Sequence, residues 1–342
     1  MELGNLSVAA TTESFVPTGE TQAVSLEFEQ IIGDSTGDGK LILPQGIDVQ
    51  EETGNIYVSD SQNDRVAVFN KEGNFLFDFG QDQIDESANL EFNNITGQIF
   101  VGDVKGNEID VFEPDGTYVR SFGEFTVGTD RPFEGPAGVA FSPDFEKLYV
   151  ANYAGDDIYV FDSITGERID VIGGESGTEP GQLSGPAALA ISETTGNLYV
   201  SEQLNSRVQV LTPEGESVAT FGEPRPRAVD PSIPVPDDLQ PGQLSGPVDL
   251  TLDEFDNVYV SDTLNNRIQV FDSKGDFLTL VDEFPAEPST YFWSIGAHYE
   301  DGKLYTSDFF NNRVVAFDVN QQASTSISEP FLDLGVCWLG LL

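Results

Sequence analysis

Short apolar runs separated by polar turns recur along most of the chain. Each run is rich in β-branched and aromatic residues, and Gly, Asn or Asp follows it. One unit of this pattern consists of GPVDLTL (246–252), VYVSD (258–262), IQVFD (268–272) and FLTLV (277–281). Such runs, bounded by turn residues, predict β-strands, whereas no segment keeps a helical period. The pattern therefore predicts an all-β protein built from units of four short antiparallel strands.

The second strand of this unit has six copies. They are IYVSD (56–60), IFVGD (99–103), LYVAN (148–152), LYVSE (198–202), VYVSD (258–262) and LYTSD (304–308). Their starts lie 43, 49, 50, 60 and 46 residues apart, and four-stranded units at such a spacing are typical of a β-propeller. We predict a six-bladed β-propeller over residues 23–319. Its blades are expected to start near residues 44, 87, 135, 185, 246 and 292.

The ends of this repeat predict how the ring closes. The sixth copy lacks an obvious fourth strand, whereas AVSLEFEQIIG (23–33) resembles a fourth strand that precedes the first copy. The linker after it, GDGKLILPQG, matches the linkers EPGQLSGP and QPGQLSGP before later copies. We therefore predict that strand 23–33 completes the last blade and removes an open sheet edge, with residues 1–22 and 320–342 as extensions. The alternative is that PFLDLG (330–335) takes this place.

A polar turn, Asp-x-x-Asn-x-Arg, follows the second strand in several copies. Asp and Asn side chains accept hydrogen bonds from turn amides, and the guanidinium of arginine pairs with a nearby carboxylate. Because the turn recurs, we interpret it as structural rather than catalytic. The expected pairs are Asp60 with Arg65, Glu202 with Arg207, Asp262 with Arg267, and Asp308 with Arg313.

The repeated unit has the form G-P-x-x-[LV]-x-[LVI]…[ILV]-Y-V-[SA]-[DE]-x-x-N-x-R-[IV]-x-V-F. It resembles the NHL repeat, in a six-bladed propeller, over residues 24–319. NHL propellers include RNA-binding and protein-binding domains, sensor domains and the lyase that processes peptidylglycine. Related six-bladed propellers are metal-dependent lactonases and esterases. The resemblance therefore implies the fold and leaves the function open, because one architecture hosts unrelated activities.

The charge balance is strongly acidic, with 59 Asp and Glu residues against 15 Lys and Arg residues and a formal net charge of −44. Such a field repels nucleic acid and anionic membrane surfaces, and it attracts cations and basic partners. We therefore expect no nucleic-acid partner. The acidic excess is also consistent with a halophilic or marine source, and the alternative is that it only maintains solubility.

Two residue counts exclude particular chemistries. His298 is the single histidine, so a three-histidine zinc site cannot be built and a Ser-His-Asp triad has one candidate base. We expect His298 to be a packed or bridging residue at the end of a strand. The single cysteine, Cys337, excludes an internal disulfide.

The termini and the hydropathy pattern bear on location. The segment MELGNLSVAATTESF at the start does not read as a signal peptide. No run approaches the roughly 20 apolar residues of a membrane helix, and the apolar tail FLDLGVCWLGLL (331–342) is shorter. We interpret this tail as a packed or frayed end, or as the remnant of a sorting signal. We expect a monomer without a membrane segment, in an extracellular or cell-surface location rather than a cytoplasmic one.

Two copies replace the arginine of the turn with an acidic residue. In the second copy Glu108 faces Asp103, and in the third copy Asp157 stands beside Asp156 and Asn152. Clusters of carboxylate and amide oxygens suit Ca²⁺ or another hard divalent cation. The alternative is an acidic turn that is solvated.

The linker DSTGDGKLILPQ (34–45) also has acidic residues in the order of an EF-hand loop, with Asp34 and Asp38 among them. Gln45 stands where the loop would need a bidentate Glu, and no helices flank it. The linker interpretation is therefore preferred to a calcium loop.

The first strand of each blade is expected to line a central channel. Aligned copies offer Gly46, Asn89, Gly138, Ala188, Asp249 and Ser294, and two residues further on Asp48, Glu91, Ala140, Ala190, Thr251 and Gly296. Asp48, Asn89, Glu91 and Asp249 would bring oxygen atoms toward the axis. The lactonase-like propellers hold a divalent metal there with such ligands, where it polarises a carbonyl and activates water. The alternative is a water-filled channel.

The largest irregularity is EPRPRAVDPSIPVPDDLQPGQ (223–243), between the fourth and fifth copies. It contains six prolines, and its candidate binding residues are Arg225, Arg227, Pro234 and Pro236. Proline makes a long loop extended and rigid, and loops on rigid scaffolds often carry function, although this one could be a tolerated insertion. We predict a non-enzymatic binding propeller that presents loops on one face to a protein, a glycan or a small ligand. The alternative is a divalent-metal-dependent hydrolase or lyase at the channel mouth.

Overall fold

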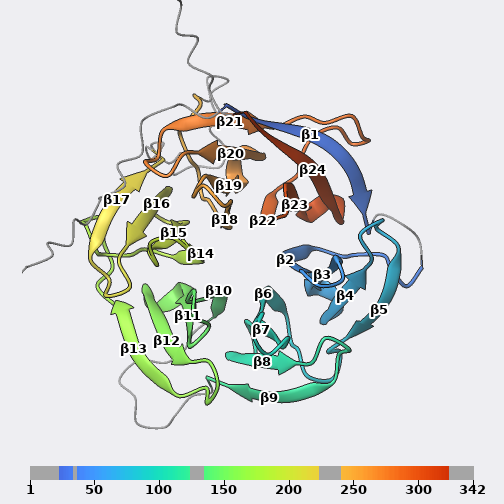
Figure 1. Ribbon diagram of the computed structural model, residues 1–342, viewed down its shortest axis with the longest axis horizontal. Helices are drawn as coiled ribbons and strands as arrows, with labels where there is room; N and C mark the ends of the chain where they lie inside the picture. Colours follow the sequence, from blue (N-terminus) through green and yellow to red (C-terminus); the bar gives the residue numbers. More distant parts are fainter. Residues whose placement is uncertain (1–22, 34–36, 124–134, 223–239, 323–342) are drawn as a thin grey trace, which may run out of the picture. The chain divides into compact units, whose positions relative to one another are not determined.

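The computed structural model describes residues 23–33, 37–123, 135–222 and 240–322. Residues 24–320 form one compact unit. It is a ring of six four-stranded antiparallel sheets around a central axis (Figure 1), and we number the sheets blade 1 to blade 6 in chain order. The prediction of an all-β, six-bladed propeller is confirmed. Within the described ranges, no helix is long and apolar enough to cross a membrane.

In blades 1 to 5 the strands follow one another from the axis outward (Figure 1). Blade 1 contains β2 (Pro44–Gln50), β3 (Asn55–Asp60), β4 (Arg65–Phe69) and β5 (Phe75–Phe79). Blade 2 contains β6 (Ser87–Phe92), β7 (Ile99–Asp103), β8 (Glu108–Phe112) and β9 (Tyr118–Phe122). Blade 3 contains β10 (Pro136–Phe141), β11 (Lys147–Asn152), β12 (Asp157–Asp162) and β13 (Arg168–Gly173). Blade 4 contains β14 (Pro186–Ile191), β15 (Leu198–Glu202), β16 (Arg207–Leu211) and β17 (Ser217–Phe221). Blade 5 contains β18 (Leu250–Leu252), β19 (Val258–Asp262), β20 (Arg267–Phe271) and β21 (Phe277–Val281).

Blade 6 combines strands from both ends of the propeller sequence. From the axis outward it contains β22 (Ser294–Glu300), β23 (Lys303–Asp308), β24 (Arg313–Gln322) and β1 (Ala23–Ile32). Figure 1 shows β1, in blue, beside β24, in red. The prediction that an N-terminal strand completes the last blade is confirmed. The competing segment 330–335 lies outside the described residues.

The hydrophobic core lies between the blades. Among the described residues, six buried apolar clusters each combine side chains of two neighbouring sheets. Between blades 1 and 2, for example, Tyr57 and Val66 pack against Leu90, Phe92 and Ile99. Burying one such side chain contributes roughly 1.5–3 kcal/mol. Apolar residues on both faces of the middle strands therefore stabilise the ring as a whole.

The recurring polar turn of each blade contacts the linker that leads into the next blade. A residue in the left-handed conformation ends it, such as Asp64 (φ 49°) or Asn312 (φ 56°), a conformation that Asp and Asn tolerate. The side-chain oxygen of this residue accepts an N–H from the following linker, as Asn312 Oδ1 does from Leu43 at 2.9 Å. The other contacts of this kind are Asp64–Glu86, Asn107–Gly135, Asp156–Gly185, Ser206–Gly246 and Asn266–Trp293. The contact from Asn312 to Leu43 closes the ring between blades 6 and 1.

The acidic excess predicts a salt dependence of stability. With a formal net charge of −44, like charges repel one another in the folded state. The screening length falls from about 10 Å at 0.1 M salt to about 3 Å at 1 M. We therefore expect the melting temperature to rise over this range of NaCl concentration, as measured by thermal unfolding. A flat or falling melting temperature would contradict this expectation.

Candidate functional site

The innermost strands of the six blades surround the central axis of the ring, the predicted position of the channel (Figure 1). The strand pairing defines two rings of channel residues on these strands. The upper ring, at the face that carries the polar turns, contains Gly46, Asn89, Gly138, Ala188, Asp249 and Gly296. The lower ring contains Asp48, Glu91, Ala140, Ala190, Thr251 and His298.

In blade 6 the sequence alignment of the channel is wrong by two residues. Ala297 pairs with Thr306 as Ile47 pairs with Val58, so Gly296 and His298, not Ser294 and Gly296, belong to the two rings. The cause is a short hairpin. Strands β22 and β23 are joined by two residues with positive φ, Asp301 and Gly302, whereas four residues join the corresponding strands of blade 1.

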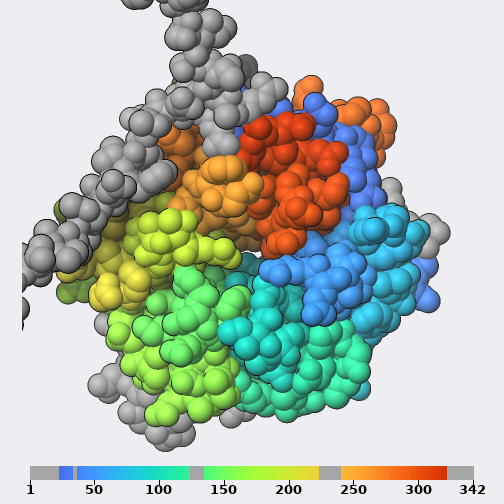
Figure 2. Space-filling model, viewed as in Figure 1, coloured from blue at the N-terminus to red at the C-terminus, as the bar shows by residue number. Residues whose placement is uncertain are grey.

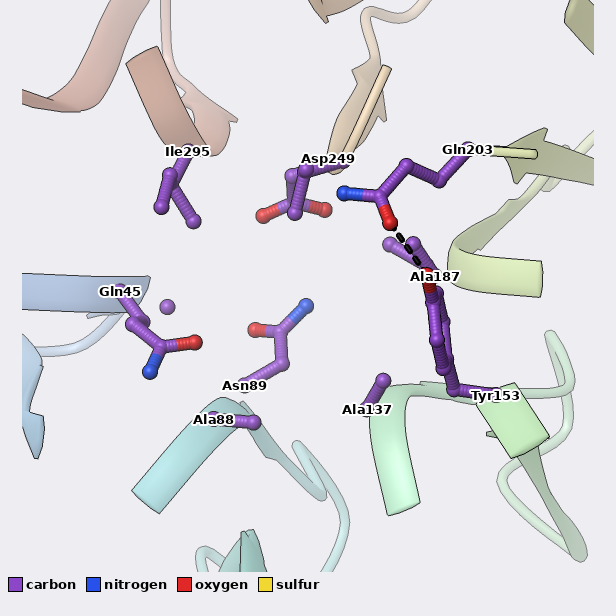
Figure 3. A pocket seen from close by; sticks show the side chains of 12 residues that line it. Gln45, Ala88, Asn89, Ala137, Tyr153, Ala187, Gln203, Asp249 and Ile295 are labelled. Atoms are coloured by element: carbon purple, nitrogen blue, oxygen red, sulfur yellow. Dashed lines mark hydrogen bonds between the residues drawn. The ribbon is translucent and has the colours of Figure 1, made fainter. Parts of the chain in front are cut away.

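The upper ring opens into a pocket of about 120 Å³. Its lining residues are Gln45, Gly46, Ala88, Asn89, Ala137, Tyr153, Ala187, Ala188, Gln203, Val248, Asp249 and Ile295. Viewed along the axis of the ring, the space-filling model shows the blades meeting around a narrow central opening (Figure 2). In Figure 3 the polar ends of Gln45, Asn89 and Asp249 face the interior, and alanine side chains line another part of the wall. The Tyr153 hydroxyl donates to Gln203 Oε1, which leaves the Gln203 amide nitrogen directed toward Asp249 (Figure 3).

Channel carboxylates connect neighbouring inner strands. Asp48 Oδ2 accepts the Phe92 N–H of blade 2 at 2.7 Å, and Asp249 Oδ2 accepts the Ala297 N–H of blade 6 at 3.1 Å. Glu91 Oε1 accepts an N–H from blade 3 at 3.3 Å. These backbone donors lie on strands with no inner neighbour, so the carboxylates satisfy groups that would otherwise be left without a partner. The acidic residues of the channel therefore help to hold the ring together.

Burial of these carboxylates changes their proton affinity. Asp48 and Asp249 are each 5 % exposed, and burial raises the pKa of both to about 7. Burial, together with the charges of Asp48 and Asp249, raises the pKa of Glu91 well above its usual value. Desolvation penalises the charged form of a carboxyl group. A cation entering the channel would therefore displace protons from these groups near neutral pH.

His298 lies in the channel wall beside Asp48. Its Nε2 atom is 3.2 Å from Asp48 Oδ1, yet Nε2 has no hydrogen-bond partner in the described part of the chain. Burial lowers the pKa of His298 to about 4, so the imidazole is neutral at physiological pH. The sequence alignment missed this residue because the register error in blade 6 placed Gly296 at its position.

The arginines of the polar turns hold the linkers before their blades. The Nε atoms of Arg65, Arg207, Arg267 and Arg313 lie 2.7, 2.6, 2.7 and 2.8 Å from Asp60, Glu202, Asp262 and Asp308. Each of these guanidinium groups also donates to a linker carbonyl, as Arg267 Nη2 does to Gln243 at 2.8 Å and Arg65 Nη2 to Asp38 at 2.9 Å. These contacts fit a structural function, because each guanidinium connects a buried carboxylate to a linker backbone.

Blades 2 and 3 differ in how they satisfy their acidic turns. In blade 3, Asn152 Nδ2 donates to Asp157 Oδ1 at 2.7 Å, and Asp156 Oδ1 accepts the Gly185 N–H at 2.7 Å. In blade 2, Asp103 and Glu108 lie together with a third carboxylate, Asp110, which was not among the residues singled out in the sequence. Ligand atoms of these three residues all lie within 4.8 Å of one another, the only such group of three acidic, His or Cys residues in the described ranges. This triad could hold a metal ion.

Two candidate segments cannot be placed. Arg225, Arg227, Pro234 and Pro236 lie outside the described residues, as does Asp34 of the linker between β1 and β2. The pocket residues Val248 and Asp249 belong to the described range 240–322, which follows residues 223–239 in the sequence.

Comparisons with known proteins support the fold. No model of a protein family matches the chain, and no curated protein sequence matches it. A Bacteroides thetaiotaomicron protein of unknown function matches with a TM-score of 0.66 and 17 % identity, over 88 % of this chain and 77 % of that one. Virginiamycin B lyase from Staphylococcus aureus matches with a TM-score of 0.58 and 14 % identity, over 86 % of this chain and 99 % of the lyase chain. A chain of the nidogen–laminin complex matches with a TM-score of 0.57 and 14 % identity, over 79 % of this chain and 95 % of that one. The chain therefore shares the six-bladed architecture with a lyase and with a component of a protein complex.

Proposed function

We propose that the chain is an NHL-type binding propeller that accepts a cationic group at the mouth of its central channel. The group would be an ammonium, either the end of a lysine side chain on a partner protein or a small free amine. The observation that carries this proposal is the position of Asp249 in the pocket that Gln45 and Asn89 also line (Figure 3), with Asp48 and Glu91 in the ring below.

The chemistry of the pocket favours a cation with several donors. An ammonium donates three hydrogen bonds and accepts none, and the pocket offers the carboxylate of Asp249 and the amide oxygens of Gln45 and Asn89. Opposite charges attract more strongly in a partly buried site than in bulk water. None of the described residues that line the pocket is a lysine or an arginine. The overall charge of the protein would also steer cations toward the pocket.

The size of the pocket limits the ligand. An engineered cavity of about 150 Å³ holds one benzene molecule, so a pocket of about 120 Å³ suits a group of a few non-hydrogen atoms. This volume suits the end of a side chain or a small amine. A glycan or a larger partner would have to bind mainly outside the pocket, on the face that carries the polar turns.

A second candidate is a metal-dependent hydrolase or lyase, and the contact between His298 and Asp48 favours it. One feature favours binding instead. In the described ranges, no three ligand atoms of channel carboxylates or His298 lie within 4.8 Å of one another. A metal bound by three of these residues would require them to move closer together.

Calorimetric titration with Nα-acetyl-lysine amide tests the proposal. We expect saturable binding at pH 8, and no binding of the uncharged analogue Nα-acetyl-norleucine amide. Substitution Asp249→Asn should weaken binding at least tenfold, because it removes the charge that meets the ammonium. The exposed residue Glu214 supplies the control, since Glu214→Gln makes the same charge change outside the channel.

The same titration predicts a pH dependence with a defined sign. Asp48 and Asp249 have pKa values of about 7, and that of Glu91 is raised too. His298 stays neutral, with a pKa of about 4, and the lysine amine stays protonated, with a pKa near 10.4. Affinity should therefore fall as the pH decreases from 8 to 5.5. Constant affinity over this range would contradict a site built on these carboxylates. Turnover of an ester or lactone that Asp48→Asn abolishes would favour the enzyme.

A further inference from the structure

We propose that blade 2 binds one divalent cation of the calcium class between Asp103, Glu108 and Asp110. This site is separate from the channel and does not depend on the function proposed for it. Asp110 is 1 % exposed, and within the described part of the chain its Oδ2 atom has no hydrogen-bond partner. Glu108 Oε2 is likewise buried without a partner among the described residues. A buried, unpaired carboxylate is costly, and a bound cation would remove this cost.

The other blades show what occupies the corresponding position. In blade 5, Arg267 Nε lies 2.7 Å from Asp262, and Gln269 Nε2 donates to the same carboxylate at 2.9 Å. Blade 4 repeats this arrangement with Glu202, Arg207 and Gln209. By strand register, Asp103, Glu108 and Asp110 stand where blade 5 has Asp262, Arg267 and Gln269. Blade 2 has therefore replaced a cationic donor and an amide donor with two further carboxylates.

The protein itself supplies no positive charge to this triad in the described ranges. Lys105, the basic residue nearest in sequence, is directed elsewhere: its Nζ lies 3.6 Å from Asp85 and 3.1 Å from Glu86. Asp103 is fixed by the N–H groups of Asp85 and Gly106, both at 2.8 Å. Blade 3 differs, because its Asn152 amide already donates to Asp157. The unpaired acceptors are therefore particular to blade 2 among the acidic turns.

The set of ligands suits a hard cation. Ca²⁺ takes six to eight oxygen ligands from carboxylates, backbone carbonyls and waters. The arginines of blades 1, 4 and 5 donate to the carbonyls of Lys40, Gln182 and Gln243. Each of these residues precedes a buried leucine of the linker, and in blade 2 Gln83 precedes the buried Ile84. The proposed site therefore adds the Gln83 carbonyl, with water molecules completing the coordination.

The test replaces the blade 2 triad with the arrangement of blade 5. The double variant Glu108→Arg, Asp110→Gln recreates the Asp–Arg–Gln set in the full chain. After removal of metals with a chelator, Ca²⁺ should bind wild type with a saturable stoichiometry of one at this site and raise its melting temperature. In the double variant this binding and this rise should disappear, and the metal-free protein should melt at a higher temperature than metal-free wild type.

Each outcome separates the site from diffuse cation binding to an acidic protein. Diffuse binding would give the same Ca²⁺ response in wild type and in the double variant at equal ionic strength, and that result would overturn the proposal. If the double variant does not fold, Asp110→Asn replaces it. The expected result is then at least tenfold weaker Ca²⁺ binding, and unchanged affinity would again overturn the proposal. The channel titration with the lysine probe should be unaffected by either variant.

Discussion

Deletion of residues 1–33 is expected to abolish the cooperative unfolding of the propeller. The deletion removes β1, in which Val24 and Ile32 are buried and Leu26, Phe28 and Ile31 are partly buried. These side chains belong to the two apolar clusters that blade 6 shares with blades 5 and 1. At roughly 1.5–3 kcal/mol for a fully buried side chain, these residues together contribute on the order of 5–10 kcal/mol. This approaches the whole stability of a typical domain, about 5–15 kcal/mol.

The deletion would also leave β24 as an open edge that invites aggregation. Thermal unfolding followed by circular dichroism, together with light scattering, measures both effects. The matched control is deletion of residues 1–22 alone, which leaves β1 complete and should keep the melting transition of the full chain. A variant without residues 1–33 that melts like the full chain would show that β1 does not close the ring.

Arg267→Ala is expected to cause the largest loss of stability from a single substitution among the polar turns. Asp262 is fully buried and Arg267 is 3 % exposed, and the guanidinium also donates to the carbonyls of Gln240 and Gln243. Truncation leaves a buried carboxylate without its charge partner. Breaking a buried ion pair in this way costs about 3–5 kcal/mol. The linker before blade 5 would lose its attachment to the turn at the same time.

Urea unfolding of Arg267→Ala measures this loss as a change in the free energy of unfolding. Lys274→Ala is the control, because Lys274 is exposed in a turn of the same blade and its removal should change the free energy by less than about 0.5 kcal/mol. Similar free energies for both variants would contradict a structural function of the Asp–Arg pairs.

The architecture could be predicted from the sequence because it is periodic. The spacing of the six LYVSD-like strands defines the blades, and the GQLSGP-like linkers reveal that strand 23–33 stands in the place of a fourth strand. Both signals survive changes at individual positions. The register of the inner strand of blade 6 could not be predicted in this way. Its first hairpin is two residues shorter than that of blade 1, and no Gly-Pro pair marks its start.

The chemistry of the candidate sites depends on tertiary contacts that the sequence does not display. Asn152 with Asp157 and Asp103 with Glu108 look alike as acidic turns, yet only the first pair is joined by an amide hydrogen bond. Asp110 was missed because its position varies between blades, with Ala67, Tyr159, Gln209 and Gln269 at the others in blades 1 to 5. The raised pKa values of Asp48 and Asp249 arise from burial in the channel. The alternation of polar and apolar residues along a strand does not show how deeply such a carboxylate is buried.

A crystal structure of the protein with Nα-acetyl-lysine amide, obtained at pH 8, tests the central claim most directly. Binding at the channel mouth predicts electron density for the ammonium within hydrogen-bond distance, about 2.7–3.2 Å, of the Asp249 carboxylate and of Gln45 or Asn89. The propeller backbone should be unchanged. An unoccupied channel mouth, with the ligand bound elsewhere or absent at saturating concentration, would contradict the account.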